Sequence, residues 1–450
     1  MALPPGPSSS ALSQTWQWLR HPYEFLDECA RRYGDTFHCH ILGFGHVAAF
    51  TSPECIKEIY AGSSETFAGG KANAVLRPFV GANSVLVLDG EPHHRQRKLL
   101  MPALHGERMH AYGQAMLDLA SESLDSWPLD APFALHARMQ DVTLRIILRT
   151  IFGVAPGTTF DHIIRVTKEA VEIASNPLLL FHFMQLDLGR RSPWGRFLYL
   201  QRQIDDVLRA EVDQRRSDGP DRRRNDVFAM LIEARDDNGA PMTFQELRDE
   251  LVTMLVAGHE TTATALAWSL SYLLRDPELC AQLRSELGTA TEGGRLVPER
   301  VAKLELLDAT VREALRIRPV APMVGRILQH PIKLGGYDIP AGWAVAPVIY
   351  LAHRRSPAFP EPERFDPRRF LRGRPTPNEW LPFGGGIRRC IGAAFASYEM
   401  KMVLATVLSR AELQLRPGYE ARAVRRGVTL APLDGVPVTL SARRPARLQA

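Results

Sequence analysis

The chain has 450 residues, of which 45% are hydrophobic and 23% charged, and its formal net charge is +5. No repeat, low-complexity linker or shift in composition divides it. We therefore expect one domain over residues 1–450, with residues 1–20 as a poorly ordered arm. The basic residues do not alternate with aromatic ones, so nucleic-acid binding is not expected and an acidic protein partner is favoured.

The cysteines and the apolar stretches indicate the cellular compartment in which the protein is expected. The five cysteines are an odd number and form no CxxC pair, which argues against a disulfide scaffold or a zinc site and favours a reducing compartment. The N-terminus lacks the charged and apolar regions of a signal peptide. The most apolar stretch, 251–274, contains His259 and Glu260, which are costly in lipid. We expect a cytoplasmic protein with no membrane segment.

Helices are expected to dominate the first half of the chain. The first is predicted over residues 23–33. A hairpin should follow, with strands 36–40 and 47–50 around the turn Gly43-Phe44-Gly45. Residues 92–216 are mostly helical in pattern, with breaks near 127–128, 153–157 and 176–177.

The strongest predicted helix begins at Thr243. Thr243 and Glu246 have the capping-box spacing, in which each side chain satisfies a free backbone amide of the other residue. The helical pattern persists to Arg275, before Asp276-Pro277 ends it. At this length the helix is roughly 50 Å long, enough to cross a whole domain. We expect it to be the spine of the fold.

The second half combines helices with small sheets. Helices are expected up to Ile317, followed by a Pro- and Gly-rich stretch to about residue 378. A last helix is predicted over 392–408, and then a hairpin that pairs 428–430 with 436–440 around Asp434-Gly435. The fold class is therefore mainly α with small β-sheets.

The segment Phe383 to Gly392 carries the most specific chemical signal. Its three consecutive glycines exclude a helix and permit tight turns. Cys390 follows them just ahead of the last helix, where the helix dipole, free amides and nearby arginines would stabilise a thiolate. A cysteine in this setting is either a soft metal ligand or a buried structural residue.

The pattern of this segment, F-x-x-G-x-R-x-C-x-G, resembles the haem-ligand signature of the cytochrome P-450 family at every fixed position. Three further motifs extend the resemblance over nearly the whole chain. The resemblance implies a single cytochrome P-450 domain of the soluble bacterial type, with haem b between the long helix and the cysteine-loop helix. Cys390 would be the iron ligand, and Phe383 would contact the haem.

Ala257-Gly258-His259-Glu260-Thr261-Thr262 resembles the family's oxygen-binding motif, midway along the long helix. Gly258 would let a flat ligand approach the backbone, and Ala257 would lie beside it. Thr261 can bond back to the carbonyl of Ala257, four residues earlier, and loosen the helix. The resemblance gives Thr261 and Glu260 the catalytic role of proton delivery.

Two further motifs are implied to hold the cysteine loop. Glu313 and Arg316 form the family's E-x-x-R, and at i, i+3 they share one helix face and can pair. Pro367 to Phe370 resembles the P-x-R-F segment, which makes Arg369 the third member of the network.

Four basic residues fit the haem propionates. His93 and Arg97 are at i, i+4 on one helix, although His94 beside them leaves the register open. Arg326 and Arg388 complete the set. In family register, their charges suit anionic carboxylates.

The resemblance implies a monooxygenase that inserts one oxygen atom of O2 into a hydrophobic small molecule. No dinucleotide fingerprint or iron–sulfur pattern is present, so electrons would come from a separate ferredoxin or flavodoxin to a monomeric enzyme. Arg388, Arg389, Arg95 and Lys98 are candidates for its docking face. Two alternatives remain, a peroxide-driven haem-thiolate enzyme and a non-catalytic haem sensor or carrier.

The substrate is predicted only by class. Its pocket should draw on the apolar stretches 71–86, 171–188, 254–257, 320–324 and 428–430, which suit a fatty acid, terpenoid, steroid or macrolide. Lys71 or Arg77 could anchor a carboxylate.

Overall fold

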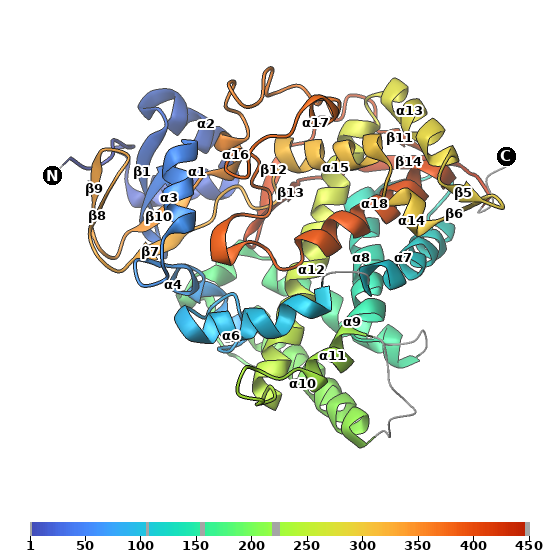
Figure 1. Cartoon of the computed structure of the whole chain (residues 1–450), viewed down its shortest axis with the longest axis horizontal. Coiled ribbons are helices and arrows are strands. Elements are labelled where there is room, and N and C mark those ends of the chain that lie inside the picture. Colours follow the sequence, from blue (N-terminus) through green and yellow to red (C-terminus); the bar gives the residue numbers. More distant parts are fainter. Residues whose placement is uncertain (1, 105–107, 154–157, 218–225, 446–450) are drawn as a thin grey trace.

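Helices form most of the molecule, and the strands of the largest sheet gather at one end of it, as Figure 1 shows. The structure is a computed structural model that describes residues 2–104, 108–153, 158–217 and 226–445. The predicted fold class, mainly α with small β-sheets, is confirmed.

The helices are α1 (Ala11–Arg20), α2 (Pro22–Tyr33), α3 (Pro53–Ala61), α4 (Gly69–Ala72), α5 (Arg77–Val80), α6 (Gly90–Leu100), α7 (Arg108–Asp125), α8 (Leu135–Thr150), α9 (Thr158–Ala174), α10 (Pro193–Ser217), α11 (Val227–Glu233), α12 (Phe244–Leu273), α13 (Pro277–Gly288), α14 (Pro298–Val301), α15 (Glu305–Ile317), α16 (Ile349–Ala352), α17 (Arg369–Arg372) and α18 (Ala393–Arg410). The expected break at 153–157 falls largely outside the described residues.

The strands are β1 (Thr36–Ile41), β2 (Gly45–Phe50), β3 (Phe67–Ala68), β4 (Pro132–Ala134), β5 (Thr291–Glu292), β6 (Arg295–Leu296), β7 (Arg326–Leu328), β8 (Ile332–Leu334), β9 (Tyr337–Ile339), β10 (Ala344–Pro347), β11 (Ala411–Leu415), β12 (Ala423–Arg426), β13 (Thr429–Pro432) and β14 (Pro437–Arg443). The largest sheet has the order β1-β2-β10-β7-β3. Its antiparallel β1–β2 pair is the predicted hairpin.

Helix α12 runs through the middle of the molecule (Figure 1). Its capping box is present as predicted, with the Thr243 hydroxyl and the Glu246 carboxylate each accepting from the other's backbone amide. The helix packs against α8, α15 and α18, and most of its 30 residues are buried on every side. Across the part of the chain that the structure describes, no helix is both long and apolar enough to cross a membrane.

The N-terminal segment corrects one prediction. Residues 1–20 were expected to be a poorly ordered arm, but residues 11–20 form α1, which packs against β1. The amide of His40 in β1 donates to the buried Gln14 side chain at 2.8 Å, and Thr15 accepts from Leu42 at 2.9 Å. The face of α1 that packs on β1 therefore carries polar residues, and in the sequence these residues look like those of a solvent-exposed segment.

The C-terminal strands correct a second prediction. The hairpin was expected between 428–430 and 436–440, but β13 pairs with β12 across the turn at Gly427, where φ is +54°. Strand β14 instead joins β11 and β4 in another sheet. Gly435 does form a turn, with φ +64°, but this turn connects two different sheets.

Candidate active site

The cysteine loop is a tight turn packed on α3. Gly384 and Gly386 have φ of +67° and +64°, values that L side chains rarely adopt. A Cβ on Gly386 would lie 2.1 Å from the carbonyl oxygen of Tyr60, and one on Gly385 2.4 Å from its ring. The Cys390 amide donates to the Phe383 carbonyl at 2.9 Å, which closes the loop. The glycines therefore place Cys390 three residues before α18 begins.

Cys390 differs from the other four cysteines, because they are buried and it is exposed. The surrounding loop still desolvates the thiol and raises its pKa, while the Gly392 amide, Arg389 and Arg97 lower it. Burial is the largest cause. The loop therefore opposes ionisation of the thiol more than its arginines favour it, and a bound metal cation would favour the thiolate.

The middle of α12 is accessible although most residues of the helix are buried. Ala257 is exposed and Thr261 partly exposed. The Thr261 hydroxyl donates to the Ala257 carbonyl at 2.6 Å, which confirms the predicted bond. These two residues, one turn apart, share one face, and this face can meet a ligand inside the molecule.

Gly258 has a different neighbour from the one expected. A Cβ at this position would lie 2.9 Å from Cδ1 of Ile147 in α8. The missing side chain therefore allows α8 and α12 to pack closely, since it leaves room for Ile147. The approach of a flat ligand to the backbone of Gly258, which is partly exposed, stays a prediction beside this helix–helix contact.

Glu260 is buried and is held by three side chains that the sequence did not indicate. Gln140 donates to its carboxylate at 2.6 Å, Arg426 donates at 3.2 Å, and His136 Nε2 lies 3.7 Å away. Burial raises the pKa of Glu260, and Arg426 and Gln140 partly oppose this rise. Arg426 also donates to the exposed Glu172 at 2.6 Å. A polar route therefore leads from Glu260 to the surface.

The four residues expected at the haem propionates come together. His93 is buried and His94 exposed, which settles the register left open by the sequence. Burial, together with the charges of Arg388, Arg97 and Arg326, lowers the pKa of His93 to about 3. Arg388 reaches Asp89 at 2.6 Å. Among the described residues, Asp89 is the one acid paired with any of these cations, and His93 Nδ1 has no hydrogen-bond partner.

The haem that the sequence resemblance implies fits these residues. The cluster around His93 has an excess of positive charge and an orphaned ring nitrogen, as expected for groups that bind carboxylates. The accessible Cys390 thiol supplies a soft ligand for iron.

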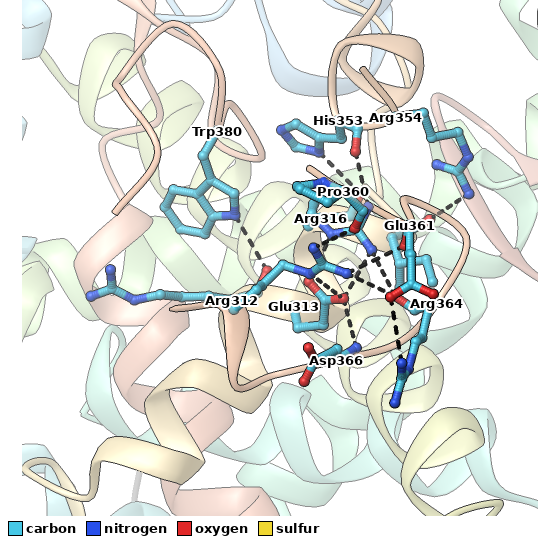
Figure 2. Close-up of polar contacts among 12 residues, drawn as sticks. Arg312, Glu313, Arg316, His353, Arg354, Pro360, Glu361, Arg364, Asp366 and Trp380 are labelled. Atoms are coloured by element: carbon cyan, nitrogen blue, oxygen red, sulfur yellow. Dashed lines mark hydrogen bonds and ion pairs between the residues drawn. The ribbon is translucent and has the colours of Figure 1, made fainter. Parts of the chain in front are cut away.

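Glu313, Arg316 and Arg369 form a buried network, whose surroundings appear in Figure 2. Arg316 donates to Glu313 through Nε at 2.7 Å and Nη2 at 2.9 Å, and both side chains are fully buried. Arg369 Nε and the Asp366 amide donate to the same carboxylate at 3.1 and 2.9 Å. Every charge in this network is paired.

His353 connects this network to the cysteine loop, a link that the sequence did not indicate. Arg316 Nη1 donates to the His353 carbonyl at 2.9 Å, and His353 Nδ1 lies 3.0 Å from the Arg316 carbonyl. The amide of Leu381, two residues before Phe383, donates to His353 Nε2 at 2.7 Å. The E-x-x-R pair is thereby joined to the start of the loop through one imidazole ring.

The candidate docking face is less basic than expected. Arg95 pairs with Asp236 and Glu246, both at 2.6 Å, and Lys98 pairs with Asp237. These partners neutralise both cations. Arg388 points into the cluster around His93, so of the four candidates Arg389 remains exposed and, within the described chain, without an ion pair.

Several of the stretches expected at the substrate pocket pack against one another. Phe79 and Val80 pack with Leu179 and Leu180 in one hydrophobic cluster. Residues 183 and 184 are exposed, so their apolar side chains do not form part of that core. Lys71 and Arg77, the candidate carboxylate anchors, are also exposed.

The chain is similar to known proteins over nearly its whole length. The family described as Cytochrome P450 matches residues 4–433. Two proteins of Mycobacterium tuberculosis, described as “Putative cytochrome P450 135B1” and “Putative cytochrome P450 138”, are 37% and 35% identical to the chain. These alignments cover 99% and 98% of this chain, and 92% and 97% of the relatives.

Among solved structures, the retinoic acid-bound cyanobacterial CYP120A1 shares the fold with a TM-score of 0.85 and 24% sequence identity, covering 98% of this chain and 100% of that one. With the family match along almost the entire sequence, the accessible Cys390 and the cation cluster have a common explanation. The chain belongs to the cytochrome P450 family of haem-dependent monooxygenases.

Proposed function

We propose that this enzyme is a cytoplasmic, single-domain monomer. It inserts one oxygen atom from O2 into a hydrophobic small molecule such as a fatty acid, terpenoid, steroid or macrolide. Its cofactor is haem b, and its electrons come from a separate ferredoxin or flavodoxin. Cys390 ligates the iron, and the cluster of His93, Arg97, Arg326 and Arg388 binds the propionates, with Phe383 and Ala257 against the ring.

The observation that carries the proposal is the route from Glu260 through Arg426 to Glu172, beside the accessible Thr261. Oxygen activation consumes protons, whereas a carrier or sensor needs none and a peroxide-driven enzyme receives its oxygen already reduced. A buried carboxyl group with a polar connection to solvent suits proton transfer.

When bound, the haem supplies a thiolate-ligated iron that activates O2 and transfers oxygen. The protein's own residues manage protons. Burial keeps the pKa of Glu260 above its ordinary value, so that the carboxyl group can hold a proton and release it. Thr261 donates to Ala257 at rest, and rotation of its hydroxyl would redirect that proton toward the accessible face of α12.

The test combines spectroscopy with turnover. Ferric protein is titrated with fatty acids, terpenoids, steroids and macrolides while the Soret band is followed. NADH consumption and product formation are then measured with a surrogate ferredoxin system. A blue shift with one class and an oxygenated product that depends on NADH are expected. Product formed with peroxide alone would indicate the peroxide-driven alternative, and electron uptake without product would indicate a sensor or carrier.

A further inference from the structure

The segment that connects α5 to α6, residues 83–89, holds Arg388 largely through its backbone. The Arg388 guanidinium donates to the backbone carbonyls of Val85 and Leu86 at 3.2 and 3.4 Å. Its Nη2 also pairs with Asp89 at 2.6 Å, at the end of the segment. Because carbonyls and a carboxylate of one short segment bind this side chain, the position of the segment sets the position of the guanidinium.

The same segment is attached to α12 by two adjacent carboxyl groups, both fully buried. Asp249 accepts from the backbone and side-chain amides of Asn83, both at 2.9 Å. Glu250 accepts from the backbone amide of Val85 at 2.8 Å. The carbonyl of Val85 accepts from Arg388, so this one residue connects Glu250 with the cluster around His93.

The two carboxyl groups differ in how their charge is balanced. Asp249 pairs with Arg248 at 3.0 Å. Glu250 has no ion pair within the described chain, and its Oε2 is buried without a hydrogen-bond partner. Burial raises the pKa of Glu250 to about 8, and the amide of Val85 partly opposes this rise. The charges of Asp249 and Glu246, on the same helix, raise the pKa further.

The elements around this part of α12 do not compensate a charge on Glu250. They carry Asp89 in the segment itself, His93 and Arg95 in α6, and Asp205 in α10. Arg95, Asp205 and Asp89 are each held in an ion pair with another residue, and burial keeps His93 neutral. None of the four contributes to the pKa shift of Glu250. The protonated form of Glu250 therefore suits this site, since ionisation would leave a buried charge unpaired.

We propose that Glu250 is a positioning residue for the haem: by holding residues 83–89 on α12, its carboxyl group keeps Arg388 in place for a haem propionate. The inference rests on the proposed function, which assigns Arg388 to a propionate. It also implies a pH dependence. When the segment leaves α12, Glu250 meets water and regains the ordinary glutamate pKa of 4.5. Attachment is therefore complete below about pH 4.5, weakens as the pH rises, and changes no further above about pH 8.

The test measures haem loss as a function of pH. Transfer of haem to apomyoglobin is followed from about pH 6 to about pH 9, a range that spans the upper end of this transition. Haem-loaded wild type is compared with Glu250→Gln and Glu250→Leu. Glutamine keeps the shape and the acceptor oxygen but does not ionise, whereas leucine leaves the Val85 amide without a partner. Glu233→Gln, at an exposed glutamate of α11, is the matched control.

Wild type and Glu233→Gln should lose haem faster as the pH rises to 8, by about threefold to tenfold per pH unit, and then level off. Glu250→Gln should lose haem slowly at every pH, at or below the lowest wild-type rate. Glu250→Leu should lose haem about tenfold or more faster than Glu250→Gln, because a buried amide without a partner is unfavourable. In an Arg388→Ala background, Glu250→Leu should add little, since it acts through Arg388.

Three results would each overturn the proposal: a wild-type rate that does not change with pH, a pH dependence that persists in Glu250→Gln, or equal rates in Glu250→Gln and Glu250→Leu. A full additional effect of Glu250→Leu in Arg388→Ala would do the same. If Glu250→Leu does not fold, the pH profile of Glu250→Gln still decides. The reduced carbon monoxide spectrum and NADH-dependent product formation are recorded on the same preparations. If these remain positive, only the role of Glu250 is lost and the monooxygenase function stands.

Discussion

The Glu313 network and the cation cluster around His93 handle buried charge in opposite ways. In the network, each charge has a partner, and Figure 2 shows the contacts between Glu313 and Arg316, whose side chains are both fully buried. In the cluster, three arginines surround a neutral histidine. Among the described residues, Asp89 is the one acid that pairs with any of these arginines.

This difference separates structural charges from binding charges. The network is complete without a ligand, since its hydrogen bonds fix the backbone from Arg316 through His353 to Leu381. The cluster becomes electrically balanced only when an anion arrives. Loss of a network residue should therefore damage the fold, whereas loss of a cluster residue should damage cofactor retention.

The largest effect is expected from Cys390→Ser, which removes the proposed iron ligand that both regions serve. The reduced carbon monoxide complex should lose its thiolate signature entirely, because serine does not replace a soft anionic ligand. Cys55→Ser, at a buried cysteine in α3, serves as the control. A thiolate signature that persists in Cys390→Ser would show that another residue ligates the iron.

Thr261→Ala should uncouple electron consumption from product formation. A positioned proton donor contributes about 10²–10⁴-fold to a rate, so product per NADH should fall by roughly tenfold or more as hydrogen peroxide is released. Thr262→Ala removes a similar bond, to the Gly258 carbonyl at 2.9 Å, from a buried side chain and should stay coupled. Equal coupling in the wild type and Thr261→Ala would remove the assigned role.

Glu313→Gln should lower the free energy of unfolding by about 3–5 kcal/mol, because it leaves two buried guanidiniums without their carboxylate. Denaturant titration measures the loss. Glu28→Gln is the matched control, since Glu28 pairs with Arg31 at the same i, i+3 spacing but on the surface. This variant should leave the free energy of unfolding almost unchanged. Similar losses in both variants would show that burial does not set the cost of losing the carboxylate.

Arg388→Ala should weaken haem retention while the fold persists. Loss of charge-assisted hydrogen bonds to a propionate costs about 1.5–3 kcal/mol, or roughly tenfold to a hundredfold in affinity. Haem transfer to apomyoglobin measures it. Arg374→Ala, at an exposed arginine, should retain haem as the wild type does. Unfolding instead of haem loss would place Arg388 with the structural charges.

Arg426→Met should shift a pH profile without abolishing activity. Arg426 lowers the pKa of Glu260, so its removal raises that pKa and moves the limb of the activity profile controlled by Glu260 to higher pH. Glu172→Gln removes a negative charge that slightly raises the pKa of Glu260, so it should shift the limb less and to lower pH. A shift to lower pH would contradict the assigned electrostatics.

The sequence predicted the fold class, the long helix and the membership of both charge clusters, because capping residues and motifs are local signals. Thr243 and Glu246 identify a helix start by spacing alone. The hairpin partner of Thr429–Pro432 was predicted incorrectly, since Asp434-Gly435 is a genuine turn and only long-range packing decides which strands pair across it.

The residues that complete each site could not be predicted. Gln140 and Arg426 reach Glu260 from positions 120 and 166 residues away, and His353 joins Arg316 across 37 residues. No spacing rule connects them. In β12, the Arg425 Nε and Nη2 atoms are buried without a hydrogen-bond partner among the described residues, and no sequence pattern could have indicated this.

The β12–β13 hairpin holds two adjacent arginines on opposite faces, one against Trp18 and one against Glu260. Side chains alternate along a strand, so a change of one residue in the turn at Gly427 and Val428 would exchange the two faces. Exposed turns usually accept insertions and deletions, and Val428 is 44% exposed. This turn should nevertheless tolerate substitution but not a change of length. Libraries of variants should therefore randomise the residues of the turn and keep the number of residues in the turn fixed.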